Sequence, residues 1–454
     1  MYDDTIVAVA TPLGEGGIAV IRISGSAAAS IAAQIFRPAH PGALRPFRLR
    51  YGHVIEPSSG HVIDEALVTF MRAPRSFTRE DVVELSLHGG PLPVQRTLGL
   101  CLAAGARLAT PGEFTMRAFL NGRIDLSQAE ASLDVIRAQT DAALALAQAQ
   151  LGGWLAQSVQ AIRRDLLEAL AYITVIVDFP EDEVEPQDIG PQLRRGLARV
   201  AELLQGADQG LLYRQGARVA LVGRPNVGKS SLLNALLRSD RAIVTPIPGT
   251  TRDTLEESAN LAGIPVVLID TAGIHASPDP VERLGIERSR LALAQADLAL
   301  LVLDITQALS ADDMQIAELI GEKPCIEVWN KLDEEPHVQA PASTRDRQRP
   351  AVLISAHTGQ GLDGLVQAIA HTLLGGAPPA TGMTHLITNP RHRDALRRAQ
   401  ELLTAALSGY ETGHPSDLLA GDLTAALNAL GEITGESVGD DLLDTIFSRF
   451  CIGK

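Results

Sequence analysis

Hydrophobic positions change their spacing along the chain, and each change marks a candidate domain. In the first part, short apolar runs rich in β-branched residues are separated by glycine and proline. Segments 18–23, 66–70 and 82–87 are predicted strands, and 92–104 is a predicted helix. This pattern predicts a small α+β domain over residues 1–120.

Helical spacing replaces this pattern from about residue 125. Ser127 and Glu130 have the spacing of a capping box at a helix start. Apolar residues then follow at helical intervals: Leu144, Ala147 and Leu151. The helical texture is broken at 178–180 and predicts a first helical segment over 121–212.

Strands and helices alternate between residues 216 and 378. Short, continuously apolar strands are predicted at 219–222, 266–269, 298–303, 325–328 and 352–354. Such strands, separated by helices, are typical of a parallel sheet that is covered on both faces.

Helical spacing returns after residue 380. One predicted helix face carries Leu423, Leu427 and Leu430, and another carries Leu443, Ile446, Phe447 and Phe450. Neither helical segment has enough apolar surface for its own core. We therefore expect one all-α domain built from 121–212 and 379–454 and interrupted by the α/β domain at 216–378.

Composition narrows the class of protein. No apolar run approaches the roughly 20 residues that cross a bilayer, and no signal peptide is expected, so a cytoplasmic protein without a membrane anchor is predicted. Three cysteines fit a reducing compartment. The net charge of −15 means that any RNA partner must meet a local basic patch or be presented by another protein.

A phosphate-binding loop follows the first strand of the α/β segment. Its sequence is Gly223-Arg224-Pro225-Asn226-Val227-Gly228-Lys229-Ser230. Strand–loop–helix is the context that this motif requires. Lys229 is expected to reach the β- and γ-phosphates of the nucleotide, and the Ser230 hydroxyl to ligate magnesium.

Three further motifs end predicted strands and indicate guanine: Asp270-Thr271-Ala272-Gly273, Asn330-Lys331-Leu332-Asp333 and Ser355-Ala356-His357. Asp270 can hold magnesium through water, and the Gly273 amide can contact the γ-phosphate. A buried Asp333 can pair with the N1 and N2 donors of guanine and would reject adenine, which lacks that donor pair. The Ala356 amide is expected to contact the base.

The water-positioning group of Ras-like enzymes is absent. Ile274 follows the Asp-x-x-Gly motif where those enzymes carry glutamine, so another group must orient water or hydrolysis is slow. The Asn226 amide oxygen is a candidate cation ligand. Carbonyls and hydroxyls come from Thr245-Pro246-Ile247-Pro248-Gly249-Thr250-Thr251, with Thr251 expected on magnesium.

Several motifs of this chain resemble those of known protein families. The segments 223–231 and 249–253 resemble the TrmE-Era-EngA-YihA-Septin GTPases. The whole chain resembles the MnmE/TrmE family through Thr5-Ile6-Val7-Ala8, Arg22-Ile23-Ser24-Gly25, Phe77-Thr78-Arg79-Glu80-Asp81, His88-Gly89-Gly90-Pro91 and Phe450-Cys451-Ile452-Gly453-Lys454. The resemblance implies a multidomain chain: an α+β folate-binding-like domain, an all-α domain and an inserted Ras-like α/β P-loop GTPase domain.

The resemblance also implies a potassium-dependent GTP hydrolase that works as a homodimer. Potassium would be bound by Asn226, Thr245, Ile247 and Thr250. Glu282 would be the catalytic glutamate that orients water, although by itself it fits a solvated carboxylate at a helix start. The implied GTP-binding set is Asn226, Val227, Gly228, Lys229, Ser230, Ser231, Thr245, Pro246, Ile247, Pro248, Gly249, Thr250, Asp270, Thr271, Ala272, Gly273, Asn330, Lys331, Asp333, Ser355, Ala356 and His357.

For the N-terminal domain, the resemblance implies a site for 5,10-methylene- or 5-formyl-tetrahydrofolate. Its ligands would be Arg22, Glu84, Arg123 and Lys454. A carboxylate such as Glu84 suits the amino-pyrimidinone edge of a pterin, and arginines suit the glutamate carboxylates. By itself, the domain indicates no site, and His88 is interpreted as a structural turn residue.

Cys451 in the C-terminal Cys-Ile-Gly-Lys segment leaves two interpretations open. The resemblance links it to tRNA modification, which needs a thiolate of depressed pKa. A buried structural cysteine is the other interpretation.

The family resemblance predicts an enzyme that modifies C5 of the wobble uridine of certain tRNAs. The added group would be carboxymethylaminomethyl or aminomethyl, and an FAD-containing partner of the MnmG/GidA family would handle redox. The competing hypotheses are a ribosome-assembly GTPase switch of the Era/EngA type and a nucleotide-binding scaffold without turnover.

Overall fold

The computed structural model describes residues 4–12, 14–179, 185–239, 256–270, 290, 293–337, 349–377 and 385–453. The chain divides into two compact units, which are described separately. The first unit comprises Met1–Leu133, Leu151–Arg163 and Leu427–Lys454, and the second comprises Asp134–Gln150 and Arg164–Ala426.

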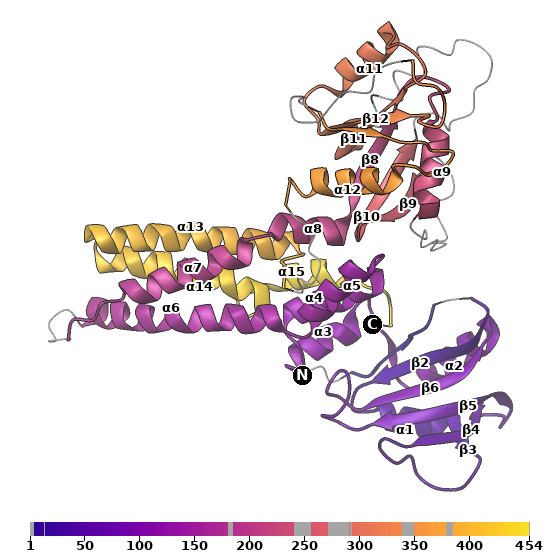
Figure 1. The fold of residues 1–454 in the computed structure, drawn as a ribbon. Helices are drawn as coiled ribbons and strands as arrows, with labels where there is room; N and C mark the ends of the chain where they lie inside the picture. Colours follow the sequence, from indigo (N-terminus) through magenta and orange to yellow (C-terminus); the bar gives the residue numbers. More distant parts are fainter. Residues whose placement is uncertain are drawn as a thin grey trace. The chain divides into compact units, whose positions relative to one another are not determined.

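A mixed seven-stranded sheet forms the core of the first unit (Figure 1). Its strands are β1 (Ile6–Val9), β2 (Gly16–Ser24), β3 (Phe36–Pro38), β4 (Leu49–Ile55), β5 (Val62–Met71), β6 (Val82–Gly89) and β7 (Arg107–Leu108). Their spatial order is β3-β4-β5-β6-β2-β1-β7, and among the ladders between these strands only β1–β7 is parallel. The three strands and the helix predicted here are confirmed as parts of β2, β5, β6 and α2 (Pro91–Ala103).

The two faces of this sheet differ in chemistry. Ile21, Ile23 and Leu85 are fully buried and pack in one core with α1 (Ala28–Ile35) and α2. Because side chains alternate along a strand, Arg22 and Glu84 lie on the opposite face. They are directly paired in the β2–β6 register.

Helices from distant parts of the sequence pack together within each unit. The helices are α3 (Glu113–Leu120), α4 (Leu126–Arg137), α5 (Asp141–Leu151), α6 (Trp154–Asp178), α7 (Gly190–Leu204), α8 (Ala207–Gln215), α13 (Pro390–Thr412), α14 (Ser416–Thr434) and α15 (Asp440–Phe447). In the first unit, Leu126 and Leu133 of α4 share a core with Ile446 and Phe447 of α15. In the second unit, α7 packs against α13. Each unit thus contains packed helices from both helical segments of the sequence.

The start of α4 differs from the predicted capping box. The Asp125 carboxylate accepts the Gln128 amide at 3.0 Å, and the Gln128 side-chain oxygen accepts the Asp125 amide at 3.0 Å. Ser127 lies inside the helix, where its hydroxyl donates to Asp125 at 2.6 Å. The prediction of Ser127 and Glu130 was wrong by two residues, because Asp125 and Gln128 make the same reciprocal pair of bonds two positions earlier and the helix begins there.

A six-stranded sheet forms the α/β part of the second unit. Its strands are β8 (Ala217–Val222), β9 (Glu256–Leu261), β10 (Ile264–Asp270), β11 (Leu298–Asp304), β12 (Cys325–Asn330) and β13 (Ala351–Leu353), in the order β13-β12-β11-β8-β10-β9. All five predicted strands are confirmed. The edge strand β9, which is antiparallel to β10, was not predicted, since its sequence has few apolar residues.

Helices cover both faces of this sheet (Figure 1). On one face, Val219 and Leu221 pack with α9 (Lys229–Ser239) and α12 (Leu362–Leu373). On the other face, Ala220 and Val222 pack with α11 (Ala311–Ile320). The Ras-like α/β class expected from the sequence is confirmed.

The core of the α/β sheet continues into the neighbouring helices of the same unit. Leu146 of α5, Tyr213 of α8 and Leu386 are buried in one cluster with Ile264 and Val266 of β10. A Cβ added at Gly263, in the β9–β10 turn, would lie 3.4 Å from the Ala142 side chain. This continuity fixes the hairpin against α5 and α8.

None of the helices in the described ranges is long and apolar enough to cross a membrane.

The cap of α4 gives a stability prediction. Asp125→Ala removes the side chain that accepts the Gln128 amide, so the free energy of unfolding should fall by about 1 kcal/mol. Chemical denaturation of the full chain measures this change. Thr424→Ala on an exposed helix face is the control and should change stability by less than about 0.5 kcal/mol. Equal effects of the two substitutions would contradict the cap.

Candidate functional site

The predicted nucleotide motifs meet at one edge of the α/β sheet. Strands β8, β10, β11 and β12 are mutually parallel neighbours, so their carboxyl ends lie together. The phosphate loop follows β8, and Asp270, Asp304 and Asn330 end the other three strands. In open α/β sheets this edge is where ligands bind.

The backbone of the phosphate loop requires glycine at two positions. Gly223 has φ 154° and Gly228 has φ 98°. A Cβ at Gly223 would meet the Val302 carbonyl oxygen, and one at Gly228 would meet the Asn330 amide. Asn226 also adopts a left-handed conformation, with φ 64°, and its side chain is exposed. The loop therefore has the tight turn that directs backbone amides toward an anion.

Lys229 is buried in the loop that it follows. Its Nζ donates to the Gly223 carbonyl at 2.8 Å and to the Arg224 carbonyl at 2.7 Å. Burial lowers the pKa of Lys229, and the charge of Asp270 offsets part of this shift. Because a phosphate would supply the compensating negative charge, the ammonium is suited to contact one here.

Ser230 and Asp270 are brought together as predicted. The Ser230 hydroxyl donates to the Asp270 carboxylate at 2.9 Å, and Asp270 is almost fully buried at the end of β10. A hydroxyl and a carboxylate are oxygen ligands of the kind that magnesium prefers. The donor set therefore fits this ion.

Asn330 connects the phosphate loop to the loop after β13. Its Nδ2 donates to the Val227 carbonyl at 2.9 Å, and its Oδ1 accepts the Ala356 amide at 2.9 Å. Asn330 is 3% exposed. The Ala356 amide was expected to contact the guanine base, but in this structure it donates to Asn330. This bond and the bond to Val227 hold the two loops at a fixed separation.

Asp333 is exposed, which corrects the expectation of a buried carboxylate. It follows the last residue of β12 by three positions. A hydrogen bond from buried Ser355 lowers the pKa of Asp333, so the carboxylate stays ionised and can accept from guanine. His357 is also exposed.

Lys331 has a structural partner at the same edge. Its Nζ donates to Asp304 at 2.6 Å, and its backbone adopts φ 69°. Burial would raise the pKa of Asp304, but hydrogen bonds from Lys331 and Thr306 outweigh it and keep the pKa below its usual value. The ion pair fixes the turn that presents Asp333.

The sequence reading missed an ion pair that anchors the phosphate loop. Arg224 Nε donates to the Asp313 carboxylate at 2.7 Å, and Asp313 is 2% exposed. The same carboxylate forms the capping box of α11 with Ser310. The spacing of Ser310 and Asp313 is that of a capping box and could have marked the helix start, but nothing local in the sequence indicates the pairing with Arg224.

A second group of predicted residues meets on the N-terminal sheet. Arg22 Nε donates to Glu84 at 2.8 Å, and Arg22 Nη1 reaches the Gly453 carbonyl oxygen at 3.4 Å. The Arg22 guanidinium also lies over Phe77 and Phe114, at 5.9 and 5.7 Å from the ring centroids. Arg22, Glu84 and the C-terminal tail are therefore assembled in one place.

Arg123 joins this group through Phe77. Its guanidinium lies 4.8 Å from the Phe77 ring centroid. Both residues line an open cavity of about 560 Å³ with Met71, Pro74, Arg75, Ser76 and Arg79. This volume lies within the roughly 300–1,000 Å³ typical of small-molecule sites. The arginine-rich lining fits an anionic ligand.

Cys451 is exposed, which is contrary to the interpretation of a buried structural cysteine. Its carbonyl oxygen accepts the Gly112 amide at 3.4 Å, so the backbone of the tail is held to the start of α3.

His88 is exposed, and its Nδ1 lies 2.7 Å from the Asp64 carboxylate. This hydrogen bond raises the pKa of His88.

Several predicted residues lie outside the described residues. They are Thr245, Pro246, Ile247, Pro248, Gly249, Thr250 and Thr251 upstream of β9, Thr271, Ala272 and Gly273 after β10, and Ile274, Glu282 and Lys454.

Comparisons with known proteins agree with this geometry. A family model for the MnmE helical domain matches residues 126–451, and one for the GTP-binding protein TrmE N-terminus matches residues 5–123. A relative from Chloroflexus aurantiacus, described as tRNA modification GTPase MnmE, is 65% identical over 100% of both chains. One from Roseiflexus castenholzii with the same description is 59% identical over 100% of both chains.

The chain belongs to the MnmE family of tRNA modification GTPases. Membership confirms the enzyme class expected from the sequence, a GTP hydrolase. It also favours the tRNA-modification hypothesis over a ribosome-assembly switch or a scaffold without turnover.

In this MnmE-family chain, the two hydrogen bonds by which Asn330 joins the phosphate loop to the loop after β13 can be tested directly. We call this pair of bonds the Asn330 bridge. Asn330→Ala leaves the Val227 carbonyl and the Ala356 amide without their partner, so GDP affinity should fall at least about tenfold. Titration with a fluorescent GDP analogue measures the change. Asn260→Ala is the control because Asn260 holds the β9–β10 turn at the opposite edge of the sheet. Unchanged affinity in Asn330→Ala would show that the bridge does not organise the site.

Proposed function

We propose that this chain hydrolyses GTP and couples turnover to modification of the wobble uridine of certain tRNAs. The observation that carries the proposal is the assembly of the phosphate loop, Asp270, Asn330 and the 355–357 loop at one sheet edge in an MnmE-family chain. The proposed domains are 1–120, 121–212, 216–378 and 379–454; the third boundary is supported by β8, which begins at Ala217.

In the nucleotide site, Lys229 would contact the β- and γ-phosphates and the loop amides would surround them. Ser230 and Asp270, with Thr251, would hold magnesium, which neutralises developing charge on the phosphates. Asp333 would select guanine through its N1 and N2 donors. Proximity of Ser230 to Asp270 and ionisation of Asp333 support these roles.

Hydrolysis would require a monovalent ion and a second copy of the chain. We propose that Asn226, Thr245, Ile247 and Thr250 hold potassium, and that Glu282 orients the attacking water indirectly. The exposed Asn226 on its left-handed turn is open to such an ion from outside the loop. Potassium would supply the positive charge that an arginine finger gives in other GTPases.

The N-terminal site would hold a tetrahydrofolate one-carbon carrier, 5,10-methylene- or 5-formyl-tetrahydrofolate. Glu84 would pair with the pterin edge, and Arg22, Arg123 and Lys454 would contact anionic groups. An FAD-containing partner of the MnmG/GidA family would supply redox chemistry. The exposed thiol of Cys451 would take part in the modification, and its exposure supports this role.

Potassium and Glu282 can be tested together. Glu282→Ala should keep GTP affinity and slow single-turnover hydrolysis in potassium at least about 100-fold, since it removes a water-positioning group. Replacing potassium by sodium should also slow the unmodified chain. Equal rates in the two salts would eliminate the ion, and an unchanged rate in Glu282→Ala would eliminate the glutamate.

The folate site gives an independent prediction. Glu84→Gln keeps the shape of the side chain but removes its charge, so affinity for 5-formyl-tetrahydrofolate should fall at least about tenfold. Calorimetry on the full chain measures the affinity. Glu65→Gln is the matched control, because Glu65 is an exposed carboxylate on the neighbouring strand that accepts from Tyr51. If both variants bind equally, Glu84 does not contact the ligand.

A further inference from the structure

Two turns that each begin and end with arginine lie side by side in the N-terminal domain. They are residues 45–48 (Arg-Pro-Phe-Arg), immediately before β4, and residues 72–75 (Arg-Ala-Pro-Arg), immediately after β5. Because β4 and β5 are antiparallel and Leu49 lies opposite Thr69, the start of one strand and the end of the other meet. We call these two segments the paired arginine turns.

Backbone hydrogen bonds fix both turns. In each, the amide of the second arginine donates to the carbonyl of the first, at 3.3 Å in 45–48 and 3.0 Å in 72–75. The Phe47 amide donates to the Phe70 carbonyl at 2.7 Å, which attaches the first turn to the end of β5. The Arg75 guanidinium lies 5.1 Å from the centroid of the Phe47 ring, so side chains of the two turns also interact. One hydrogen-bonded backbone unit therefore carries all four arginines.

Positive charge accumulates around these turns. Residues 36–55 and 70–79 together contain seven arginines and no aspartate or glutamate. The Asp81 carboxylate reaches the second turn, but it accepts the Ala73 amide at 2.8 Å. Within the part of the chain that the structure describes, no carboxylate forms an ion pair with the arginines of the two turns. All four of them are exposed: Arg45, Arg48, Arg72 and Arg75.

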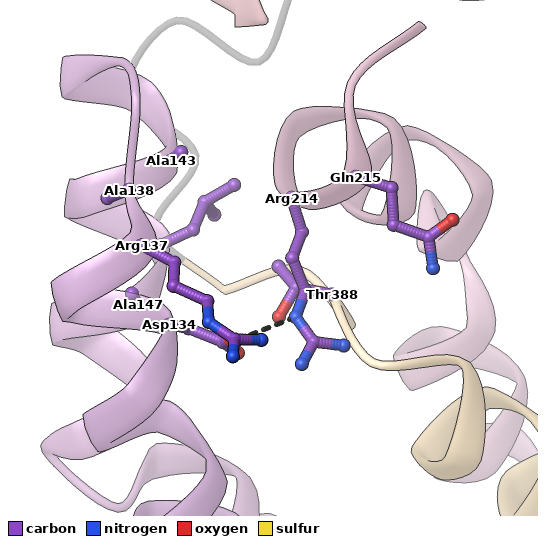
Figure 2. A pocket seen from close by; sticks show the side chains of 9 residues that line it. Asp134, Arg137, Ala138, Ala143, Ala147, Arg214, Gln215 and Thr388 are labelled. Carbon is purple, nitrogen blue, oxygen red and sulfur yellow. Dashed lines mark hydrogen bonds and ion pairs between the residues drawn. The ribbon is translucent and has the colours of Figure 1, made fainter. Parts of the chain in front are cut away.

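Several arginines of the second unit, by contrast, have carboxylate partners. Arg214 lines a cavity of about 210 Å³ and donates to Asp134 at 2.8 Å (Figure 2). Arg199 donates to Asp165 at 3.1 Å. The whole chain has a net charge of −15, so the paired arginine turns are a basic patch on an acidic protein. An RNA partner of such a protein requires a patch of this kind.

Phe47 has an unfavourable backbone conformation between the two arginines of the first turn. Its φ is 59°, in the left-handed region that bulky residues rarely adopt. The residue is nevertheless 48% exposed, so burial in the hydrophobic core does not account for this conformation. Strained residues are concentrated at functional sites. An exposed aromatic ring among arginines is an arrangement on which the unpaired bases of single-stranded RNA stack.

We propose that the paired arginine turns bind the anticodon loop of the substrate tRNA. The arginines contact backbone phosphates, and Phe47 stacks on an unpaired base. This inference rests on the proposed function, which makes a wobble uridine the site of modification. Pro74 and Arg75 also line the cavity of about 560 Å³ that we propose for the folate. RNA bound on the two turns therefore lies beside the one-carbon carrier that its uridine must reach.

Equilibrium binding of an unmodified tRNA that carries uridine at the wobble position tests the charges. In the full chain, Arg45→Gln and Arg48→Gln should each raise the Kd several-fold. The slope of log Kd against log salt should fall by about one in each variant, because one phosphate contact is lost. The matched control is Arg96→Gln, which removes an arginine of α2 in the same domain. Arg96 lies 3.8 Å from Glu56, and its substitution should change neither quantity.

The stacking role of Phe47 is measured with the same tRNA. Phe47→Leu keeps an apolar side chain but removes the aromatic ring, so the Kd should rise at least about fivefold. The salt slope should stay unchanged, because no phosphate contact is lost. An unchanged Kd in Phe47→Leu would contradict the stacking.

Affinity for 5-formyl-tetrahydrofolate separates this surface from the folate site. Arg45→Gln and Arg48→Gln should bind it as the unsubstituted chain does. If they lose folate affinity and keep tRNA affinity, the turns serve the folate site and the proposal is wrong. It is also overturned if both variants, folded as judged by circular dichroism, bind tRNA as Arg96→Gln does, or if the unsubstituted chain binds no tRNA.

All these titrations are made without GTP, which distinguishes the surface from the proposed function. If only the surface fails, the Kd values are unchanged in a chain that still hydrolyses GTP and modifies tRNA. If the proposed function fails, that hydrolysis or modification is itself absent.

Discussion

The nucleotide site depends on the two hydrogen bonds of one buried side chain. Asn330 donates to the loop after β8 and accepts from the loop after β13, although these loops are more than 100 positions apart in the sequence (Val227 and Ala356 are the contacted residues). An amide that is buried must satisfy both its donor and its acceptor. Separating the two loops would therefore leave buried polar groups without partners and would cost free energy. Asn330 is itself held in position because it ends β12, which is paired with β11 in the parallel sheet. Phosphate recognition and base recognition are thereby held in one geometry.

On the N-terminal sheet, the register between β2 and β6 holds the candidate ligand-binding residues in one geometry. Arg22 and Glu84 are directly opposed on β2 and β6, so their ion pair follows from strand pairing alone. Hydrophobic neighbours Ile21, Ile23 and Leu85 fix which face the pair occupies. Phe77 then lies against both Arg22 and Arg123, which joins residues from three parts of the domain. Their convergence is a property of the sheet, and not of any local motif.

Sequence reasoning succeeded where the information was local or carried by a motif. The apolar strands around the phosphate loop, and the position of Lys229 and Ser230 at the start of α9, follow from short patterns. It failed where a polar partner is distant in sequence or where several residues can make the same bonds. Arg224 pairs with Asp313 across 89 positions. Asp125, not Ser127, caps α4, because both residue types accept helix-end amides. Burial of Asp333 was assumed from its role, yet exposure is set by the turn after β12.

Strand β10 runs between two functional regions of the second unit. Its carboxyl end lies at the nucleotide motifs, and its amino end lies against helices α5 and α8. Its carboxyl end carries Asp270, and its amino end begins in a turn packed against Ala142 and Tyr213. Tyr213 belongs to α8, which leads directly into β8 and the phosphate loop. Protein interiors are close-packed, so a displacement of β10 must be accommodated by α5 and α8. Helices α5 and α8 therefore pack directly against the strand that ends at Asp270, and the position of this strand is set partly by residues far from the nucleotide motifs.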